Sequence, residues 1–479
     1  MKNQHVIGYL PDERPPFWKL FLYAVQQVIV MFPATVTVAL ITGFHISTTI
    51  FASGFATLVF ILVTGRKIPL YYGSSFSYVA AIASLMSSEA LQGYALNDKI
   101  AVAQFGIIMS GFVSIIAGLI VRRFGQESIE KILPPSVTGP IAMVIGLTLA
   151  GTALSDAASI VIDGAGNLAA SQAQISLAKN MAWTVSLVTL ISTILFSVYL
   201  KGIAGQLPLL LGPMVGCLTA LIVRYTTGID LFRVLPATAN SGIFALPIFT
   251  LPKPSMLAVA AIMPIAIATI PESTAHVYQL DIYINDLAKK KGVNKKYNIA
   301  DKLGLNLIGD GIGDIVAAFI GGPAGTNYGE NISAMAITKV FSTSVLMAAS
   351  IIAMVIACFT PLINLIYSIP TAVIGGMEIY LFGAIAAQGV AIMLEKKIDL
   401  FSSKNIAIIA CIMVIGLGGQ YAFNGNIPFF GMEIPCVAGA AIFGILLNIL
   451  LNVGDIIERK RVKLEQKASY TIASADSNM

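Results

Sequence analysis

Charged side chains are scarce in this chain of 479 residues: Asp, Glu, Lys and Arg together make up 11% of it, whereas hydrophobic residues make up 57%. With a mean hydropathy of +0.84, this composition excludes an ordinary soluble globular protein. Apolar runs of about 18 or more residues recur along the whole length, as in helices that cross a membrane. We therefore expect an all-α polytopic membrane protein in the lipid bilayer of the cell membrane.

Motifs of catalysis and cofactor binding are also lacking. The four cysteines are far apart and form no CxxC pair, which favours buried apolar roles. There is no Walker motif, and GDGIGD at 309–314 follows no strand, so it is no nucleotide fingerprint. Without a nucleophile–base set or a metal-ligand cluster, the sequence predicts no enzyme, cofactor or metal. Lys and Arg lie mainly in short loops, which argues against a nucleic-acid partner.

The apolar runs predict fourteen membrane spans. They cover residues 17–42, 46–65, 68–88, 100–122, 136–154, 182–201, 205–225, 254–280, 300–320, 322–340, 342–366, 370–393, 405–420 and 430–455. An even number of spans places both termini on one side. Most Lys and Arg fall on that same side, such as Arg66, Lys67 and residues 289–291, whereas Arg224 and Arg233 fall on the other. The positive-inside rule then predicts that both termini are cytoplasmic.

The two halves of the chain share a weak internal repeat. PPSVTGPIAM from Pro134 matches IPTAVIGGME from Ile369, and IPLYYGSSFSY from Ile68 matches GGPAGTNYGEN from Gly321. Because each half holds seven spans, an odd number, the halves have opposite orientations in the membrane. Inverted repeats with Gly- or Pro-interrupted segments at matching positions are typical of secondary transporters, and they mark the binding site.

The two interrupted segments, PLYYGSS and PAGTNYG, each suggest an extended stretch, a turn and a half-helix. Irregular backbone at membrane depth is tolerated only where it is buried in protein or lines a cavity. The first N–H groups of a half-helix are free and carry a partial positive charge. Two such segments meeting at mid-membrane would form a pocket suited to carbonyl oxygens. The alternative is a pair of ordinary glycine-rich bends in packed helices.

Acidic residues inside spans are functional candidates, because a buried carboxylate costs roughly 2.5–3.5 kcal/mol on insertion. Glu272 lies in the eighth span and Glu330 just after the break in the tenth. His276 follows Glu272 by one helical turn, so the two side chains share a face and could exchange a proton. The alternatives are a structural hydrogen-bonded pair for Glu272 and His276, and an offset of the helix dipole for Glu330.

The roles of three further acidic residues stay open. Asp310 and Asp314, in GDGIGD, could form a cation relay or mark a bend where helices pack. Glu378, in the twelfth span, could face the cleft or a partner helix.

The most specific stretch of the chain is TNYGENISAMAITKVFST in the tenth span, supported by GSSFSY, by the Glu272–His276 spacing and by DERPPFWK before the first span. On these motifs the chain resembles the nucleobase–cation symporter 2 family, also called nucleobase–ascorbate transporters or xanthine/uracil permeases, and is most similar to its uracil permeases. The resemblance covers nearly the whole chain, from VQQVIVMFPATV to the last span.

The resemblance implies a fold of about fourteen spans in two inverted seven-span repeats, with spans 3 and 10 interrupted by short antiparallel strands. It implies a core domain formed by 17–133 and 254–368, and a gate domain formed by 134–253 and 369–457. Cytoplasmic tails would occupy 1–16 and 458–479. The family commonly works as a homodimer through its gate domains.

The resemblance also implies roles for individual residues. Glu272 and Glu330 would accept hydrogen bonds from the ring nitrogens of a nucleobase, and His276 with Glu272 would couple transport to a proton. The remaining implied site positions are Phe76 and Gly329, whose backbone would contact the carbonyl oxygens of the base, Ser75 and Tyr328 beside them, and Asn331 and Thr338, which would hold the half-helix.

Four positions depart from the family pattern. Ser333 replaces the signature glycine, and Gln27 replaces a histidine common in the first span. In the twelfth span, Glu378 replaces a small or apolar residue, and Phe382 replaces a tyrosine. A bulkier signature and an extra acid could change which base fits or which cation drives transport.

The function expected is therefore secondary active transport: a nucleobase:proton symporter that imports uracil, or xanthine or another purine, by alternating access. Na⁺ in place of H⁺ stays open. The alternative is an inorganic-anion transporter of the same architecture, although two carboxylates pointing into the pocket would repel an anion.

Overall fold

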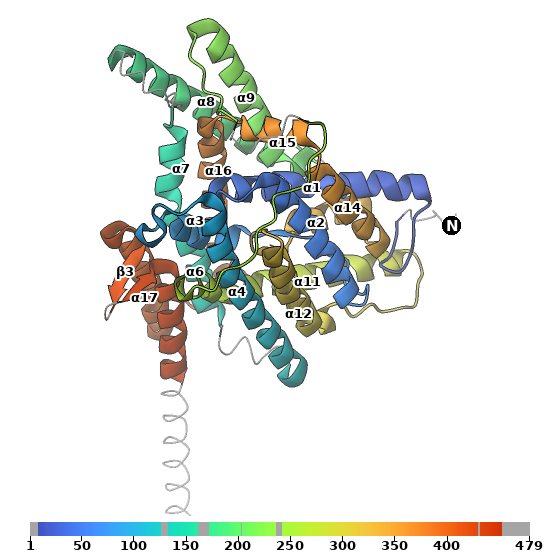
Figure 1. The fold of residues 1–479 in the computed structure, drawn as a ribbon. Helices are drawn as coiled ribbons and strands as arrows, with labels where there is room; N and C mark the ends of the chain where they lie inside the picture. Colours follow the sequence, from blue (N-terminus) through green and yellow to red (C-terminus); the bar gives the residue numbers. More distant parts are fainter. Residues whose placement is uncertain are drawn as a thin grey trace, which may run out of the picture.

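The computed structural model describes residues 8–125, 133–160, 172–202, 204–235, 242–429 and 432–452, and Figure 1 shows the fold. The predicted tail 458–479 lies outside the described residues. The helices are α1 (Phe17–Thr42), α2 (Ile46–Val63), α3 (Val79–Ser87), α4 (Leu96–Phe124), α6 (Pro135–Thr148), α7 (Ala150–Ala157), α8 (Gln172–Tyr199), α9 (Pro208–Thr227), α10 (Met256–Ile262), α11 (Ala266–Lys290), α12 (Leu303–Phe319), α13 (Gly329–Thr338), α14 (Thr343–Ala357), α15 (Thr360–Tyr367), α16 (Thr371–Glu395) and α17 (Ser403–Phe423). A last helix covers Cys436–Asn452.

Nine helical segments of the described residues are long and apolar enough to cross a membrane, and three shorter apolar helices accompany them. The two other predicted spans, 300–320 and 322–340, correspond to α12 and α13. The multi-pass helical class is therefore confirmed. The count of fourteen spans and the inverted repeat stay predictions, because the interrupted helices are too short to be counted as spans on length alone.

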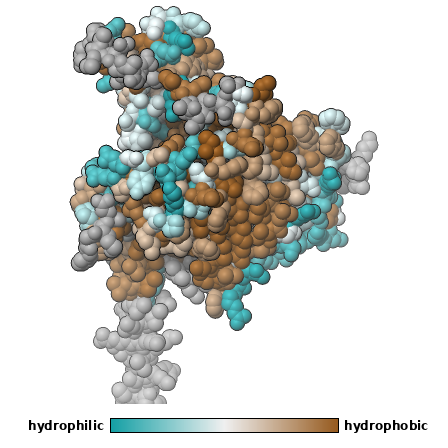
Figure 2. All heavy atoms as spheres, viewed as in Figure 1, coloured by the Kyte–Doolittle hydropathy of each residue, from teal (hydrophilic) through white to brown (hydrophobic). Residues whose placement is uncertain are grey.

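The outer surface supports this class. In Figure 2 much of the visible face is hydrophobic, with hydrophilic residues gathered toward its edges. On α4 the exposed side chains Phe112, Ile116 and Leu119 follow one another at four- and three-residue spacing and are 46%, 56% and 53% exposed. This spacing puts them on one face of the helix. Such an apolar stripe is suited to lipid rather than to water.

Helix packing joins segments far apart in the sequence. α12 packs on α4 and α2, and α14 packs on α1 and α2, whereas α16 packs on α6, α7 and α8. The glycines of GDGIGD allow one of these approaches, since a Cβ at Gly311 would lie 2.2 Å from the carbonyl oxygen of Gly111 on α4. These glycines therefore serve helix packing, as one of the two interpretations of this stretch proposed.

Two short strands interrupt the helices where the sequence predicts breaks. β1 (Tyr72–Ser74) and β2 (Gly325–Asn327) pair antiparallel, with Tyr72 opposite Asn327 and Ser74 opposite Gly325. Gly321 opens the second break with φ of 96°, a conformation that favours glycine. The expected extended stretch followed by a half-helix is thus confirmed in both segments, and the alternative of simple glycine-rich bends is wrong.

Other boundaries differ from the prediction. A second antiparallel pair, β3 (Asn426–Phe429) with β4 (Met432–Pro435), occupies the start of the predicted 430–455 span, so its helix begins at Cys436. The predicted 342–366 span divides into α14 and α15. In the opposite sense, the predicted 254–280 span continues to Lys290, because α11 extends it into a polar segment.

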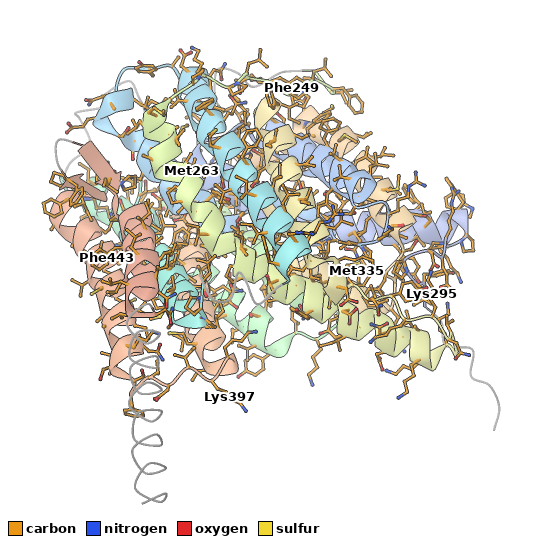
Figure 3. The ribbon with its side chains drawn as sticks, turned by 90° about the horizontal axis from the view of Figure 1, so that it is seen from below. Phe249, Met263, Lys295, Met335, Lys397 and Phe443 are labelled. Atoms are coloured by element: carbon orange, nitrogen blue, oxygen red, sulfur yellow. The ribbon has the colours of Figure 1, made fainter. Side chains whose placement is uncertain are left out.

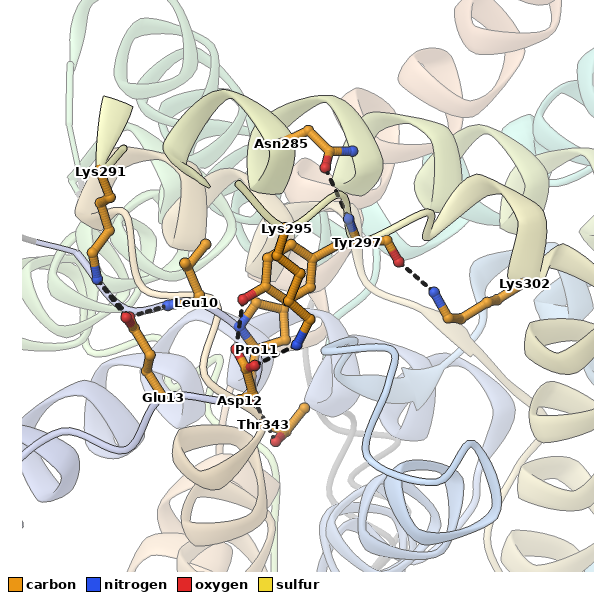
Figure 4. A network of polar contacts seen from close by, with 10 residues as sticks. All are labelled: Leu10, Pro11, Asp12, Glu13, Asn285, Lys291, Lys295, Tyr297, Lys302 and Thr343. Atoms are coloured by element: carbon orange, nitrogen blue, oxygen red, sulfur yellow. Dashed lines mark hydrogen bonds and ion pairs between the residues drawn. The ribbon is translucent and has the colours of Figure 1, made fainter. Parts of the chain in front are cut away.

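The segment 8–14, here called the N-terminal strap, is held against the ends of α11 and α13. Its backbone forms a parallel bridge, in which the Tyr9 N–H donates to Lys339 and the Phe341 N–H donates to Tyr9. Lys291 donates to the Gly8 carbonyl oxygen at 3.0 Å and to the Glu13 carboxylate at 2.6 and 2.7 Å. Figure 4 shows the contact between Lys291 and Glu13. The strap therefore connects the loop after α11 with the loop after α13.

A second acid of the strap, Asp12, accepts hydrogen bonds from Lys295 at 2.5 Å and from the Tyr297 hydroxyl at 2.6 Å. Partial burial works to raise the pKa of Asp12, but these two hydrogen bonds outweigh it and hold that pKa below its ordinary value of 3.8. Because the pKa is lowered on folding, the contribution of Asp12 is present above pH about 4 and is lost as the pH falls through the lowered value.

Replacing Lys291 by alanine is expected to speed amide hydrogen exchange across the strap by about three- to tenfold at pH 7. The change removes hydrogen bonds to a carboxylate and a carbonyl, contributions of roughly 1 kcal/mol at a partly exposed site. Hydrogen exchange with mass spectrometry measures it. Lys290→Ala is the matched control, since Lys290 pairs with Asp286 on its own helix. Equal exchange in both variants would show that Lys291 does not hold the strap.

Candidate functional site

The two strands hold the interrupted segments together at their centre. Beyond the paired residues, the Ser75 N–H donates to Ala324 and the Tyr328 N–H donates to Tyr71, both at 2.9 Å. These bonds satisfy backbone groups that a continuous helix would pair internally. The half-helices begin at the two ends of this short antiparallel ladder, with the 3₁₀ turn η1 (Phe76–Tyr78) leading into α3 and Gly329 opening α13.

Asp314 on α12 supports both strands. One oxygen of its carboxylate, Oδ1, accepts from the Tyr72 hydroxyl and from the Gly325 N–H, each at 2.7 Å. Asp314 is 2% exposed, so these partners replace water. A single side chain thus bonds a residue of β1 and a residue of β2 and fixes the pair against α12.

Asp310, one turn earlier on α12, belongs to an amide network. Asn327 Nδ2 donates to its two oxygens at 3.0 and 3.3 Å, and Asn306 Nδ2 donates to Oδ2 at 2.9 Å. Asn306 in turn accepts from Asn327 at 3.3 Å. Asp310 therefore holds the last residue of β2. Both acids of GDGIGD therefore have structural partners at the strands.

Tyr328 connects the same strands to α1. Its hydroxyl donates to the Ser74 carbonyl oxygen at 2.9 Å and shares a hydrogen bond of 3.0 Å with Thr35. Its ring covers Gly73, where a Cβ would lie 2.5 Å from the tyrosine ring. Tyr328 is 3% exposed, so its side chain positions β1 rather than presenting a free hydroxyl.

The candidate carboxylates approach this region from two helices. Glu272 lies on α11 directly after Pro271, which interrupts the helical hydrogen bonds at that turn. Its Oε2 accepts from the Ser77 hydroxyl at 3.2 Å. Glu330 lies in the first turn of α13 directly after Gly329, and the ring of His276, on the same face of α11 as Glu272, approaches Gly329 closely. The structure therefore brings Glu272, Glu330 and the start of η1 together.

His276 lies one turn along α11 and faces the start of α13. A Cβ at Gly329 would lie 2.9 Å from its Nε2, so a glycine is needed for this close approach. Its Nδ1 is buried and has no hydrogen-bond partner among the described residues. The carboxylate of Glu272 is instead turned to Ser77. Glu272 and His276 therefore lie one turn apart on α11, as predicted, but no hydrogen bond joins them in this structure.

Aromatic side chains close the region toward α16. Phe382, which is 2% exposed, belongs to an apolar cluster with Val38 of α1 and Val79 of α3, and Phe76 packs against the same cluster. Ser75 is buried, and its hydroxyl accepts from the Ser77 N–H at 3.3 Å, which caps η1. Phe76 and Phe382 therefore meet where α16 lies against the interrupted segments.

The signature residues of α13 lie on its buried side. Asn331 Nδ2 donates to Gln27 of α1, to its side-chain oxygen at 2.7 Å and to its backbone oxygen at 3.0 Å. Thr338 donates to the Ala334 carbonyl oxygen at 2.9 Å, inside its own helix. Ser333 is partly buried. In Figure 3, Met335 of this helix lies among the other helices, whereas Lys295 and Lys397 lie at the edge of the molecule.

Two cavities lie among the helices around this region. A cavity of about 760 Å³ is lined by Pro271, Ala275 and Gln279 of α11 together with α4, α6, α12 and α16, including Lys396. A second, of about 380 Å³, lies between Ser84 of α3, α6 and the β3–β4 hairpin. The larger cavity reaches the turn of α11 that carries Glu272.

The sequence anticipated Glu272, His276, Glu330, Phe76 and Gly329, which the structure brings together. Glu378 is the exception, because it lies on α16, outside this group of residues. Sequence reasoning missed Ser77, Tyr72, Asn306 and Asn327, although all but Asn306 stand in the two interrupted stretches. The four-residue spacing of Asn306 and Asp310 was a usable signal, since it puts both on one helix face. Within the described ranges, no group of three His, Cys, Asp or Glu is arranged to hold a metal ion.

Known proteins resemble this chain in sequence. The model of the permease family named Xan_ur_permease matches residues 18–425. The uracil permease of Bacillus subtilis (strain 168) is 34% identical over 448 residues, covering 92% of this chain and 94% of that protein. The uracil permease of Bacillus caldolyticus is 33% identical over 447 residues with the same coverage. The uracil permease of Escherichia coli (strain K12) is 30% identical over 456 residues, covering 95% and 96%.

Solved structures share the fold at low sequence identity. The structure of SLC26A9 has a TM-score of 0.60 at 13% identity, and it covers 91% of this chain and 65% of its own, just under two thirds. The transmembrane domain of the cyanobacterial bicarbonate transporter BicA has a TM-score of 0.55 at 14% identity, covering 90% and 96%. This architecture occurs in membrane transporters. The chain is a multi-pass transport protein of the plasma membrane and not an enzyme, and it belongs to the permease family that includes these uracil permeases.

Proposed function

We propose that the chain is a nucleobase:proton symporter that imports uracil by alternating access. The observation that carries this proposal is the pairing of β1 with β2, which brings Glu272 and Glu330 to the starts of two half-helices. Uracil has two ring N–H donors and two carbonyl acceptors. Two carboxylates and the first backbone N–H groups of two half-helices would match both sets. The uracil permeases above point to the same substrate.

In the proposed complex, Glu272 and Glu330 accept hydrogen bonds from the ring N–H groups of the base. The backbone at Phe76 and Gly329, at the starts of η1 and α13, donates to its carbonyl oxygens, where the half-helix dipoles favour partial negative charge. Ser75 lies beside this position, and the backbone of Tyr328 continues into it. Xanthine or another purine would use the same polar groups if the pocket is wide enough.

Proton coupling is assigned to Glu272 and His276. A carboxyl in a site closed to bulk water binds a proton more readily, and the neighbouring imidazole offers an unpaired ring nitrogen as relay. Loading of uracil and a proton together would reduce the negative charge of the site before it moves across the membrane. Na⁺ as coupling ion remains the alternative to H⁺, and the experiment below separates the two.

The helix packing supports a division into two moving bodies. The core domain, 17–133 and 254–368, would hold α4 with α12 and α2 with α14, and the gate domain, 134–253 and 369–457, would hold α6 and α7 with α16. The core would rock against the gate, and the cavity beside α11 would be the path to the cytoplasm. We further propose that both termini are cytoplasmic and that two gate domains pair in a homodimer.

The deciding experiment is uptake of labelled uracil into cells that lack their own nucleobase permeases. Unlabelled xanthine, hypoxanthine, guanine and sulfate serve as competitors, with and without a protonophore, in Na⁺ and in Na⁺-free buffer. Saturable uracil uptake that collapses with the proton gradient is the expected result. Uptake that requires Na⁺ would show that Na⁺ is the coupling ion. Uptake of purines alone would show that the substrate is a purine and not uracil. Inhibition by sulfate would favour an anion transporter.

Replacing Glu272 by glutamine is expected to abolish proton-driven accumulation of uracil while exchange of bound uracil across the membrane is reduced less. The amide keeps the shape and the hydrogen bond to Ser77, but it cannot bind and release a proton. Uptake against a gradient and counterflow, measured in the same proteoliposomes, separate the two. Unchanged accumulation would remove Glu272 from the coupling path.

A further inference from the structure

Glu378 stands apart from the proposed substrate site. It lies in the second turn of α16 and is 0% exposed. Neither of its carboxylate oxygens has a hydrogen-bond partner in the described part of the chain. A buried carboxylate without any donor is costly at membrane depth, by several kcal/mol in general. Within the described residues, something other than a side-chain or backbone donor must therefore satisfy this side chain.

The acid next to this turn of α16 is Asp156 at the end of α7: a Cβ at Gly375, one turn before Glu378, would lie 2.5 Å from the Asp156 carbonyl carbon. The two helices touch closely here, because a Cβ at Gly375 would lie 2.1 Å from the Ala157 backbone nitrogen. Asp156 is partly buried, and Arg233 is near enough to act on its charge. Two carboxyl groups from different helices thus meet at a contact that leaves Glu378 without water.

The other elements packed on α16 add no charge at this contact. α6 has no titratable side chain. Those of α1, which touches Met377 through Thr37, are Lys19 and Tyr23 in its first two turns, far along the helix from Thr37. The titratable residues of α8 and α9 are Lys179 and Tyr199, both exposed, and Cys217, Arg224 and Tyr225. Arg224 is paired with Asp230 at 3.3 Å. Asp156, with Arg233 behind it, is therefore the group that sets the charge state of Glu378.

We propose that Asp156 and Glu378 form a carboxyl pair that binds one proton, a proton site in the gate region that is separate from Glu272. Two ionised carboxylates at this contact would repel each other, and both would be acceptors without a donor. One shared proton turns one of them into a donor to the other, and the remaining charge faces Arg233. The proton comes from water on the side of Asp156 and returns there.

The Asp156–Glu378 pair lies close to the proposed interface between the gate and core domains. Phe382 lies one turn after Glu378 on α16 and packs with Val38 and Val79. A change in the α7–α16 contact would therefore shift the residue that closes the gate against the interrupted segments. This consequence for transport rests on the proposed function, whereas the binding of the proton by the pair does not.

Infrared spectroscopy of the purified protein without substrate tests the pair directly. The wild-type spectrum at pH 7, after subtraction of the Glu378→Gln spectrum, is expected to contain the carbonyl-stretch band of a protonated carboxyl. Other buried acids cancel in this difference. Glu89→Gln, which makes the same change at an exposed position, is expected to leave the band in place. A difference spectrum without the band would overturn the proposal.

A second variant covers the case in which Glu378→Gln does not fold. In Asp156→Asn the amide donates to the Glu378 carboxylate, so the carboxyl band is expected to disappear at a proton concentration about tenfold or more higher than in the wild type. An unchanged titration would contradict the pair. Loss of the band on addition of Na⁺, but not of N-methylglucamine, would mean that the pair is a sodium site. Since no uracil is present, failure of the substrate assignment would leave these results intact.

Discussion

Replacing Glu330 by glutamine is expected to weaken uracil binding by about 10- to 100-fold. A hydrogen bond to a carboxylate contributes roughly 1.5–3 kcal/mol, and the amide of glutamine can present an N–H to the ring N–H of the base instead of an acceptor. The backbone frame does not depend on the Glu330 side chain, since the paired strands and the Asn331–Gln27 contact remain. The loss should therefore appear in affinity and not in folding.

Calorimetric titration of the purified protein with uracil measures this loss, and a thermal unfolding curve checks that the variant is intact. Glu89→Gln is the matched control, because it exchanges the same groups at an exposed position. Full affinity in Glu330→Gln would mean that Glu330 only offsets the dipole of α13, the alternative that the sequence leaves open. Wild-type affinity in both Glu330→Gln and Glu272→Gln would remove both carboxylates from the proposed complex.

The interrupted segments were predictable because their sequence conflicts with the surrounding helices. Glycine and proline at 321–325 and the polar residues at 326–331 stand between apolar runs, and such a conflict is stable only when another segment completes the hydrogen bonds. The matching break in the first half of the chain supplied that partner. Sequence reasoning could therefore anticipate the strands and the neighbourhood of Glu272 and Glu330.

The network beneath the strands was less accessible to sequence analysis. Tyr72 and Asp314 are separated by 242 positions, and Ser77 and Glu272 by 195. No local periodicity relates such pairs, because their contact depends on how α12 and α11 pack against the breaks. The same reason explains why the sequence could state that Glu378 is unusual but could not identify Asp156 as its neighbour.

Span boundaries also depend on tertiary structure. Hydropathy does not distinguish a continuous helix from a helix pair, so the break between α14 and α15 and the β3–β4 hairpin were missed. The length of α11 was underestimated because hydropathy does not detect its polar end. Its last turns are polar but continue as a helix, and Lys291 beyond them is held by the N-terminal strap.

Asp314→Ala is expected to have the largest effect on the architecture of the site. The change leaves the Gly325 N–H without a partner and removes one of the two acceptors of the Tyr72 hydroxyl, whose other bond goes to the Asp310 carbonyl oxygen at 2.9 Å. An orphaned buried polar group costs about 1–3 kcal/mol, so the free energy of unfolding should fall by roughly 2–4 kcal/mol. Thermal unfolding in detergent measures the direction of this change.

Binding should fall together with stability in this variant, because β2 leads directly into Gly329 and Glu330. A displacement of β2 moves the carboxylate and the first N–H groups of α13 at the same time. Asp314→Asn is the matched control: its side-chain oxygen still accepts from one donor, so it should lie between the wild type and Asp314→Ala in both measurements. If Asp314→Ala lowered stability but bound uracil normally, the strand pair would support the fold without positioning the ligand. A parallel loss in both would link the buried acid of α12 to the site through the strands it holds.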